Sequence, residues 1–342
     1  MSVHRTLKKI FMKNAILVDF HIEKNWFFLK ILGENDWIAE GIETNRLHGS
    51  SIKNMLRYFI YFLFTFILVF KRKRYNKIIG WQQFYGLNFA FWSRLFCLKK
   101  VNDLTVMTFI YKRKGGLKGK LYHKYMSYIV TSKYIDRFIC FAKEECHYYS
   151  SIFGVDESKF IYVPLGYSIA TDVQISDEEY IFSTGRSNRD YDFLVNSLKN
   201  TDFKLIIACD TYHTTSENTE NIKFLNDCYG NDMLQLMAKC HCIVVPLKDL
   251  KMSSGQLVVI QAMALGKPVV CTKSDGIKDY VEDGVTGFLI DNNKEQLMSA
   301  LNKLYAQDCL YNKMAMNSLL SYKNKFTEDA MYRRISNAIN EK

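Results

Sequence analysis

Residues 253–270 of the chain read SSGQLVVIQAMALGKPVV, and the order of residue types in this stretch decides the fold. Ser253, Ser254 and Gly255 are residue types that commonly begin helices, and the apolar segment 256–265 has the composition of a helix. The Gly-Lys-Pro that follows is typical of a helix end, because glycine fits the position beyond the last turn and proline cannot continue the helix. Val-Val-Cys then indicates a short buried strand. The stretch therefore predicts a helix and a strand of an α/β domain.

The start of this predicted helix suits a phosphate. The backbone N–H groups of a first helical turn have no partner within the helix, and the helix dipole is positive at this end. Ser-Ser-Gly places no large side chain in front of these groups, so an anion can approach them. The alternative is an ordinary capped helix, which the same residues would form equally well.

The whole chain repeats this pattern. It has 342 residues, of which 48% are hydrophobic and 15% aromatic, enough for two globular domains. Short apolar segments alternate with helix-length segments, as in parallel α/β sheets. The predicted strands lie at 14–22, 77–81, 104–110, 137–141 and 160–163 in a first series, and at 180–183, 203–208, 242–245, 269–272 and 287–290 in a second. We therefore expect two doubly wound domains.

The two series differ in charge. Residues 1–166 contain 27 Lys and Arg against 12 Asp and Glu, whereas the rest of the chain contains 19 against 23. This asymmetry predicts a polyanionic partner for the first domain, either nucleic acid or an anionic membrane surface. No nucleic-acid motif accompanies the basic residues, which favours the membrane.

Cysteine usage indicates a reducing compartment. The nine cysteines are scattered and odd in number, which argues against a disulfide framework. Cys240-His241-Cys242 has the wrong spacing for zinc, since neighbouring residues of a strand point to opposite faces, and we expect it in the core. The first residues, MSVHRTLKKIFMKN, lack an apolar segment, so we expect no secretory signal there.

An aromatic segment, residues 57–74 (RYFIYFLFTFILVFKRKR), ends in a basic cluster. Its uncharged part, 58–70, has 13 residues and is predicted to be too short to cross a membrane, which takes about 20. It is either a buried helix whose basic end balances the dipole, or a peripheral helix that docks on anionic lipid. The candidate membrane residues are Phe62, Phe66, Arg72 and Arg74.

A second phosphate site is indicated after the first strand of the second series. Residues 185–190, GRSNRD, place a glycine and two arginines at a strand-to-helix turn. There the backbone can approach a diphosphate, and the guanidinium groups of Arg186 and Arg189 can bind its oxygens in pairs. The chain has neither a Walker lysine loop nor a GxGxxG fingerprint, so the expected ligand is a nucleotide diphosphate of another kind.

The order of these motifs resembles that of retaining GT-B glycosyltransferases of group 1, the family 4-like transferases of bacterial polysaccharide assembly. The matching segments are GRSNRDYDFL, IVVPL, SSGQLVVIQAMALGKPVV and EDGVTGFLI, and the resemblance covers residues 180–306 well and 75–167 more loosely. It implies two Rossmann-like domains that face a central cleft. Residues 1–166 would bind the acceptor and 167–325 the nucleotide sugar. In relatives the last helix returns to the first domain, which the sequence leaves open for 326–342.

Three positions depart from the family's pattern. The family glutamate that contacts the donor sugar is replaced by Ser253, the one that contacts the ribose by Gln261, and a lysine of the diphosphate clamp by Arg189. Ser253 and Gln261 can form hydrogen bonds but carry no charge, so a catalytically inactive nucleotide-binding partner remains an alternative. The resemblance assigns catalysis to Arg186, Arg189 and Ser253, and donor binding to Gly185, Ser254, Gly255, Gln256 and Gln261.

The acceptor side is expected in the basic domain. Residues 111–124, YKRKGGLKGKLYHK, contain six Lys and Arg where the resemblance places the acceptor, and they indicate a site for the pyrophosphate of a polyprenyl-linked saccharide. A solvated basic loop is the alternative. The family histidine after the fourth strand is absent, and His21 and His123 are candidate substitutes. The acceptor candidates are Trp81, Gln82, Lys112, Arg113 and Lys114, with Phe84 near the sugar.

The resemblance implies hexosyl transfer with retention from a nucleotide-diphosphate sugar to a lipid-linked saccharide, in exopolysaccharide, capsule or O-antigen assembly. Unlike most glycosidases, such an enzyme needs no paired carboxylates, and catalysis would rest on stabilising the leaving diphosphate. Neither a metal nor another cofactor is expected. The protein would be cytoplasmic and peripheral on the inner face of the plasma membrane, without nucleic acid as a partner. A nucleotide-sugar 2-epimerase is a further alternative.

Overall fold

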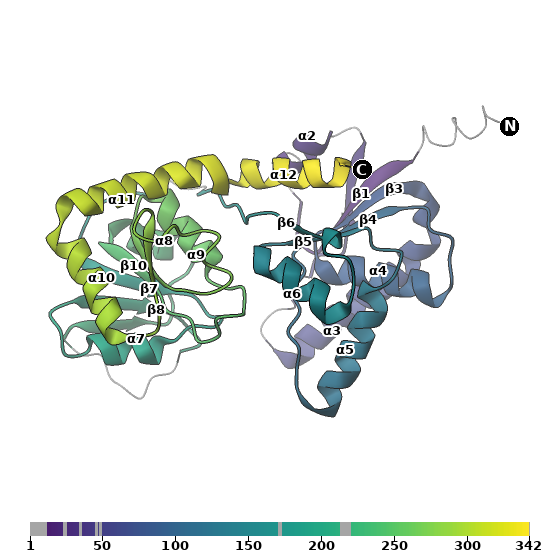
Figure 1. The fold of residues 1–342 in the computed structure, drawn as a ribbon. Helices are drawn as coiled ribbons and strands as arrows, with labels where there is room; N and C mark the ends of the chain where they lie inside the picture. Colours follow the sequence, from purple (N-terminus) through teal and green to yellow (C-terminus); the bar gives the residue numbers. More distant parts are fainter. Residues whose placement is uncertain are drawn as a thin grey trace. The chain divides into compact units, whose positions relative to one another are not determined.

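The computed structural model describes residues 12–22, 26–33, 36–44, 47, 50–169, 173–212 and 220–341. The N-terminal segment analysed for a secretory signal therefore lies almost entirely outside the described residues. The chain divides into two compact units (Figure 1). Unit 1 contains residues 1–140, 146–163 and 332–342, and unit 2 contains 141–145 and 164–331. The domain boundaries expected from the sequence, 166/167 and 325/326, lie a few residues from 163/164 and 331/332.

Unit 1 is built on a parallel six-stranded sheet with the order β2-β1-β3-β4-β5-β6. Its strands are β1 (Lys13–Val18), β2 (Trp37–Gly41), β3 (Tyr75–Gly80), β4 (Asp103–Val106), β5 (Arg137–Cys140) and β6 (Phe160–Tyr162). The helices are α2 (Phe27–Leu32), α3 (Ser51–Phe70), α4 (Gln83–Leu95), α5 (Gly116–Val130) and α6 (Lys143–Phe153), with short turns η2 (Arg72–Arg74) and η3 (Glu157–Lys159).

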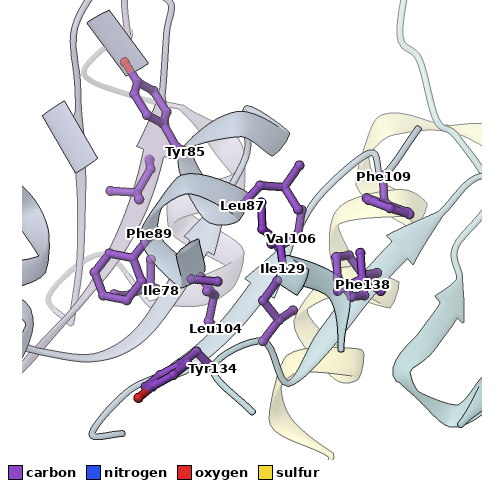
Figure 2. Close-up of a cluster of buried hydrophobic side chains, with 14 of the residues drawn as sticks. Ile78, Tyr85, Leu87, Phe89, Leu104, Val106, Phe109, Ile129, Tyr134 and Phe138 are labelled. Carbon is purple, nitrogen blue, oxygen red and sulfur yellow. The ribbon is translucent and has the colours of Figure 1, made fainter. Parts of the chain in front are cut away.

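The core of unit 1 lies between the sheet and the helices α3, α4, α5 and α6. Ile78, Leu104 and Phe138 point from the strands toward Leu87 of α4 and Ile129 of α5 (Figure 2). Each of these side chains is almost completely buried, and burial of a large apolar side chain contributes about 1.5–3 kcal/mol. This face therefore fixes helices α3, α4 and α5 firmly on the sheet.

Unit 2 has a second parallel sheet with the order β12-β11-β10-β7-β8-β9. Its strands are β7 (Tyr180–Thr184), β8 (Lys204–Ala208), β9 (Ile222–Leu225), β10 (Cys242–Val245), β11 (Val269–Thr272) and β12 (Gly287–Ile290). The helices are α7 (Tyr191–Leu198), α8 (Gly230–Lys239), α9 (Gln256–Ala264), α10 (Lys294–Ala306) and α11 (Asp308–Ser321), followed by the π-helical turn η4 (Tyr322–Phe326) and α12 (Glu328–Asn340).

Both faces of this second sheet are buried. Phe182 and Ile243 pack with helices α8 and α9 on one face, whereas their neighbours Ile181 and Val244 pack with α7 and α10 on the other. Successive strand residues point to opposite faces, so a strand covered on both sides must be apolar throughout, as CIVV of β10 is. The expected fold class of two doubly wound α/β domains is therefore confirmed.

All strands expected from the sequence are present, although β1 and β4 end earlier than expected. Two further strands, β2 and β9, were missed. Each lies at one edge of its sheet and pairs with a single neighbour. Edge strands can be short and partly polar, and WIAEG and IKFL carry too weak an apolar signal to be recognised as strands.

Helix α3 corrects one expectation. It begins at Ser51, where Ser50 Oγ accepts a hydrogen bond from Lys53 N at 3.2 Å, and it has 20 residues. By length and composition it could cross a membrane, so the prediction that this segment is too short to do so is wrong. One face of α3 is nevertheless part of the core of unit 1, where Tyr61 and Val69 are fully buried.

Helix α12 connects the two units. Its residues from Tyr332 onward belong to unit 1, where the Tyr332 ring lies 4.8 Å from that of Phe28. Lys77 Nζ of β3 donates a hydrogen bond to Ile339 O at 2.9 Å. These contacts hold the last part of the chain on the first domain.

Candidate functional site

Two loops leave the sheet of unit 2 at one place. β7 is the first strand of this sheet, β8 and β9 follow on one side of it, and β10 lies on the other side. In doubly wound sheets, ligands bind beyond the carboxyl ends of the strands where the order changes direction in this way. The loops that leave there, 185–190 and 246–255, contain every expected catalytic and donor residue except Gln256 and Gln261, which lie in helix α9.

Backbone hydrogen bonds join the two loops. Asp190 N donates to Pro246 O at 3.1 Å, and Lys248 N donates to Asn188 O at 3.2 Å. The loop after β7 and the loop after β10 therefore form one continuous surface at the end of the sheet.

Asn188, which is not among the site residues expected from the sequence, holds the two loops together. Its φ of +59° is in the left-handed region, which asparagine tolerates better than most residues. Its Nδ2 donates to Asp249 O at 2.8 Å and to Ser254 Oγ at 3.0 Å, and its Oδ1 accepts from Asp249 N at 2.8 Å. An asparagine in a strand-to-helix turn is the sequence signal that could have identified it.

Arg189 holds its own loop. Its Nε donates to Thr184 O at 3.0 Å and its Nη1 donates to Ser187 O at 2.8 Å. Gly185, with a φ of +118°, lies against this guanidinium, and a Cβ there would come within 2.3 Å of Arg189 Nη2. Burial lowers the pKa of Arg189. Two of its three nitrogens are thus committed to backbone carbonyls, so we assign its side chain a positioning role.

Arg186 is the exposed arginine of this site. Its Nε donates to Asp210 Oδ1 at 2.7 Å, and its guanidinium lies 5.4 Å from the ring centre of Tyr229. The hydrogen bond to Asp210 raises the pKa of Arg186. Burial alone would raise the pKa of Asp210, but the hydrogen bond and charge of Arg186 outweigh it and lower that pKa. The arginine is therefore charged, oriented and accessible to an anion.

Helix α9 begins where the sequence predicts, but neither serine caps it. The N-cap is Gly255, whose φ is +89°, and no side chain among the described residues caps the first turn. Ser254 Oγ accepts from Asn188 instead, and Ser253 Oγ accepts from Gln256 Nε2. A helix start with N–H groups that lack a side-chain cap is what an anion site requires.

Gln261 lies inside helix α9 with only 4% of its surface exposed. Its Oε1 is buried and has no hydrogen-bond partner in the described part of the chain. An unpaired buried acceptor costs about 1–3 kcal/mol, so a bound hydroxyl donor would relieve it. Gln261 Oε1 is therefore a buried acceptor that has no partner among the described residues.

The Cys240-His241-Cys242 segment is structural, as expected. Both cysteines are fully buried. His241 Nδ1 pairs with Asp177 Oδ2 at 2.6 Å, and the imidazole lies 4.4 Å from the Tyr311 ring centre.

The corresponding place in unit 1 is the carboxyl ends of β1 and β3. β1 is the first strand there, with β2 on one side and β3 on the other. Asp19 follows β1 and Gln82 follows β3, and Gln82 Nε2 donates to Asp19 Oδ2 at 3.3 Å. The same oxygen accepts from Tyr61 Oη of helix α3 at 2.5 Å. Asp19 was missed in the sequence because a single carboxylate after a strand gives no distinctive pattern.

Trp81, an expected acceptor residue, packs within an aromatic cluster. Its ring lies 5.2 Å from Trp26, 5.3 Å from Phe28 and 6.0 Å from Tyr332. The indole thus helps to hold α2 and α12 on the sheet. Trp81 is half-buried, so only the exposed part of its side chain can contact a ligand.

The basic segment after β4 is accessible. Lys112, Arg113 and Lys114 are all exposed, and Lys114 lines a cavity together with Phe84. Of the two candidate histidines, His21 is exposed, whereas His123 is half-buried. The Nδ1 atom of His123 is 2.8 Å from Tyr111 Oη, and its ring stacks on Phe153.

The expected membrane residues divide into two groups. Phe62 and Phe66 are half-buried and pack on Trp92, at 4.4 and 4.9 Å between ring centres. Arg72 Nη1 donates to Val69 O at 3.2 Å, and Arg74 is exposed. Six of the eight large apolar residues that α3 exposes follow a helical spacing instead. We call this set the outer stripe: Ile52, Met55, Phe59, Leu63, Ile67 and Phe70.

Sequence comparison identifies a known domain in unit 2. Residues 180–307 match the family model described as glycosyl transferases group 1. An uncharacterized glycosyltransferase of Methanocaldococcus jannaschii is 28% identical over 123 residues, which are 32% of this chain and 34% of the relative. The chain thus matches about a third of this curated relative.

Structural comparison covers almost the whole chain. Anabaena HepE in complex with UDP has a TM-score of 0.69 at 14% identity, over 96% of this chain and 99% of that protein. Sucrose-phosphate synthase of Thermosynechococcus elongatus has a TM-score of 0.67 at 14% identity, over 95% and 98%. A glycosyltransferase from Rickettsia africae has a TM-score of 0.64 at 13% identity, over 96% and 100%. The chain therefore has the GT-B fold of two Rossmann-like domains, and residues 180–307 within it match glycosyl transferases group 1.

Proposed function

We propose that the protein is a glycosyltransferase that moves a hexosyl group, with retention, from a nucleotide-diphosphate sugar to a polyprenyl-pyrophosphate-linked saccharide. The observation that carries this proposal is the joined pair of loops at the ends of β7 and β10, within the segment that matches the glycosyl transferases group 1 model. HepE, one of the structural neighbours, was solved with UDP and with UDP-glucose, which supports a nucleotide sugar as the donor.

In the proposed reaction, the diphosphate of the donor is the leaving group. Arg186 supplies an exposed positive charge that Asp210 orients, and the start of helix α9 supplies N–H groups and the positive end of a dipole. The bond between the anomeric carbon and the diphosphate oxygen breaks with its electron pair on the diphosphate. The acceptor hydroxyl oxygen bonds to the same face of that carbon, and its proton passes to the departing phosphate. This scheme uses neither a paired carboxylate nor a metal ion.

The proposed acceptor side is unit 1, at the inner face of the plasma membrane. The sequence from residue 44 to residue 102 contains no Asp or Glu, and it includes the outer stripe of α3 and the basic turn η2. An exposed apolar stripe beside basic residues binds the interface of an anionic membrane. A lipid-linked saccharide would be presented at that surface, as in exopolysaccharide, capsule or O-antigen assembly.

The test is release of nucleoside diphosphate from UDP-, GDP- and dTDP-sugars by the purified chain, with and without bacterial membrane lipid. We expect one donor to be turned over, lipid to stimulate the reaction, and Arg186→Ala to lower kcat/KM about 100-fold. Lys239→Ala is the matched control, because Lys239 forms an ion pair of unit 2 outside both loops, at 3.2 Å from Glu178, and its loss should leave kcat/KM unchanged.

The product identifies the mechanism. Nuclear magnetic resonance of the glycosylated lipid gives the anomeric configuration, and an inverted product would refute retention. Nucleotide binding without turnover across the whole panel would refute the transferase and identify an inactive partner protein. The replacement of two family glutamates by Ser253 and Gln261 would then be its cause.

A further inference from the structure

A cavity of about 550 Å³ lies between helices α3, α4 and α5 of unit 1. Its volume is within the range of small-ligand sites. Aromatic rings form most of its wall, and they come from all three helices: Tyr58, Phe59, Phe62, Phe84, Tyr122 and Tyr125. The cavity thus differs in chemistry from the donor loops of unit 2, which are polar.

Charge is nearly absent from this cavity. Among the described residues that line it, Lys114 is the one charged residue and Asn88 is the one amide. The other polar groups of the wall are the hydroxyls of three tyrosines; its remaining surface is hydrocarbon, which favours a hydrocarbon chain. A single ammonium group at such a wall suits a ligand with one apolar part and one anionic end.

The cavity opens on the surface that carries the outer stripe of α3. Phe59 belongs to both, and its side chain is 55% exposed. Tyr125, on the opposite wall, is 37% exposed. Lys112 and Arg113 precede Lys114 in the chain and are also exposed. A lipid that reaches this surface can therefore place its chain inside and its phosphate beside the basic segment.

We propose that this cavity holds the hydrocarbon chain of a lipid phosphate, namely the part of the acceptor next to its phosphate, and that Lys114 pairs with that phosphate. The identity of the lipid as the acceptor rests on the proposed function. The binding site itself does not, because it depends on the shape and chemistry of unit 1 alone.

The test is calorimetric titration of the full chain with farnesyl phosphate, without vesicles and below the concentration at which the probe forms micelles. We expect saturable binding, measurable but at least 10-fold weaker binding of farnesol, and no competition by inorganic phosphate at equal concentration. Lys114→Glu should lower the affinity for farnesyl phosphate at least 10-fold. Phe59→Asp should lower the affinity for both farnesyl phosphate and farnesol.

Lys133→Glu is the matched control. It makes the same charge reversal on an exposed lysine just beyond the other end of helix α5, whose 15 residues span about 22 Å. We expect its affinity for farnesyl phosphate to change less than threefold. An equal loss in both lysine variants would show general electrostatic attraction and would overturn the proposal.

Two other outcomes would also overturn it. Displacement of farnesyl phosphate by inorganic phosphate, with no binding of farnesol, would show a site for the head group alone. A dimer in light scattering that Phe59→Asp dissociates and farnesyl phosphate does not would show that a second copy of the chain covers the cavity.

Titration of the same variants with UDP separates this proposal from the proposed function. Unchanged UDP binding in Lys114→Glu, together with lost farnesyl phosphate binding, supports the cavity whatever the outcome of the donor panel. Turnover of a donor without any binding of farnesyl phosphate would support the proposed glycosyltransferase activity and refute the proposal that the cavity binds a lipid phosphate.

Discussion

Asn188 Nδ2 donates a hydrogen bond to Ser254 Oγ at 3.0 Å, and this contact joins the loop after β7 to the start of helix α9. The two residues are far apart in sequence and come from the two motifs that indicate phosphate binding. The serine that could have capped the helix is used by the neighbouring loop, while Gly255 takes the N-cap position. The first turn of α9 is therefore held in place, and no side chain among the described residues caps it.

Asn188→Gly should loosen this arrangement. It keeps the backbone freedom that a φ of +59° requires but removes three hydrogen bonds, so we expect the free energy of unfolding to fall by about 1–3 kcal/mol. UDP affinity should fall as well, because the helix start loses its position. Urea unfolding and UDP titration measure the two effects.

Asn188→Ala is the companion variant. It loses the same hydrogen bonds and adds the cost of a left-handed alanine, about 1 kcal/mol. Equal UDP affinity in the parent chain and in both variants would mean that Asn188 does not organise the nucleotide site.

Gly255→Ala should disturb the same helix start from within. A Cβ there would lie 3.0 Å from Val245 Cγ1, and the φ of +89° disfavours alanine by about 1–2 kcal/mol. Gly266, at the other end of α9, also has a positive φ of +63°, but a Cβ there would meet open space. Gly266→Ala should therefore lower stability by a similar backbone term and leave UDP binding unchanged, whereas Gly255→Ala should lower both. Equal UDP affinity in the two variants would contradict this.

The outer stripe of α3 should control membrane attachment. Ile67 is 56% exposed within it, so Ile67→Asp should weaken binding to anionic phospholipid vesicles at least 10-fold while leaving the unfolding transition nearly unchanged. Met316→Asp is the control, since Met316 is 71% exposed on helix α11 of unit 2. Vesicle sedimentation at two salt concentrations measures the apolar and the electrostatic parts. The same vesicle affinity in both variants would exclude α3 as the attachment site.

Lys159 should make stability depend on pH in the alkaline range. Burial lowers its pKa from 10.5 to about 8, although Nζ donates to Val130 O at 2.7 Å and to Ser132 O at 2.9 Å. Between pH 8 and 10.5 the unfolded chain therefore binds more protons at this group than the folded chain does. The free energy of unfolding contributed by Lys159 should rise with pH across this window, by about 1–2 kcal/mol after allowance for partial exposure.

Urea unfolding at pH 7 to 11 tests this dependence against Lys159→Met. The difference between the two proteins cancels the other alkaline groups. A difference that stays constant across the window would show that Lys159 keeps an ordinary pKa in the folded chain.

The sequence predicts the fold well where apolar segments are buried on both faces. CIVV of β10 and VVCT of β11 have one interpretation, because a strand covered by helices on both sides must be apolar throughout. The sequence fails at the sheet edges, where β2 and β9 are partly polar. It also fails to show where α3 begins, because the start depends on the Ser50 cap rather than on the aromatic residues.

The candidate site is predicted less completely. The sequence shows the glycines and arginines of the two loops as motifs. It does not show which partners each guanidinium contacts, because these depend on the local backbone geometry. Arg186 and Arg189 look equivalent in GRSNRD, yet the first is exposed and paired with Asp210, and the second is turned toward its own loop. Asn188 and Asp19 act through partners that are remote in sequence; the turn asparagine is the only local signal for the first, and a single carboxylate after a strand gives none for the second.

Gln261→Leu gives opposite effects on stability and on binding. The buried Oε1 of Gln261 has no partner among the described residues, so replacing the amide by a similar apolar side chain should raise the free energy of unfolding or leave it unchanged. If this oxygen accepts a ribose hydroxyl, UDP affinity should fall about 10-fold in the same variant, and the affinity for inorganic diphosphate should not. Gln261→Glu should restore a charged acceptor, lower the stability of the free protein because a carboxylate is buried, and increase the thermal shift caused by UDP. Parallel melting curves with UDP and with diphosphate measure these effects. If Gln261→Leu lowers the affinity for UDP and for diphosphate equally, Gln261 acts by positioning the loops and does not contact the ribose.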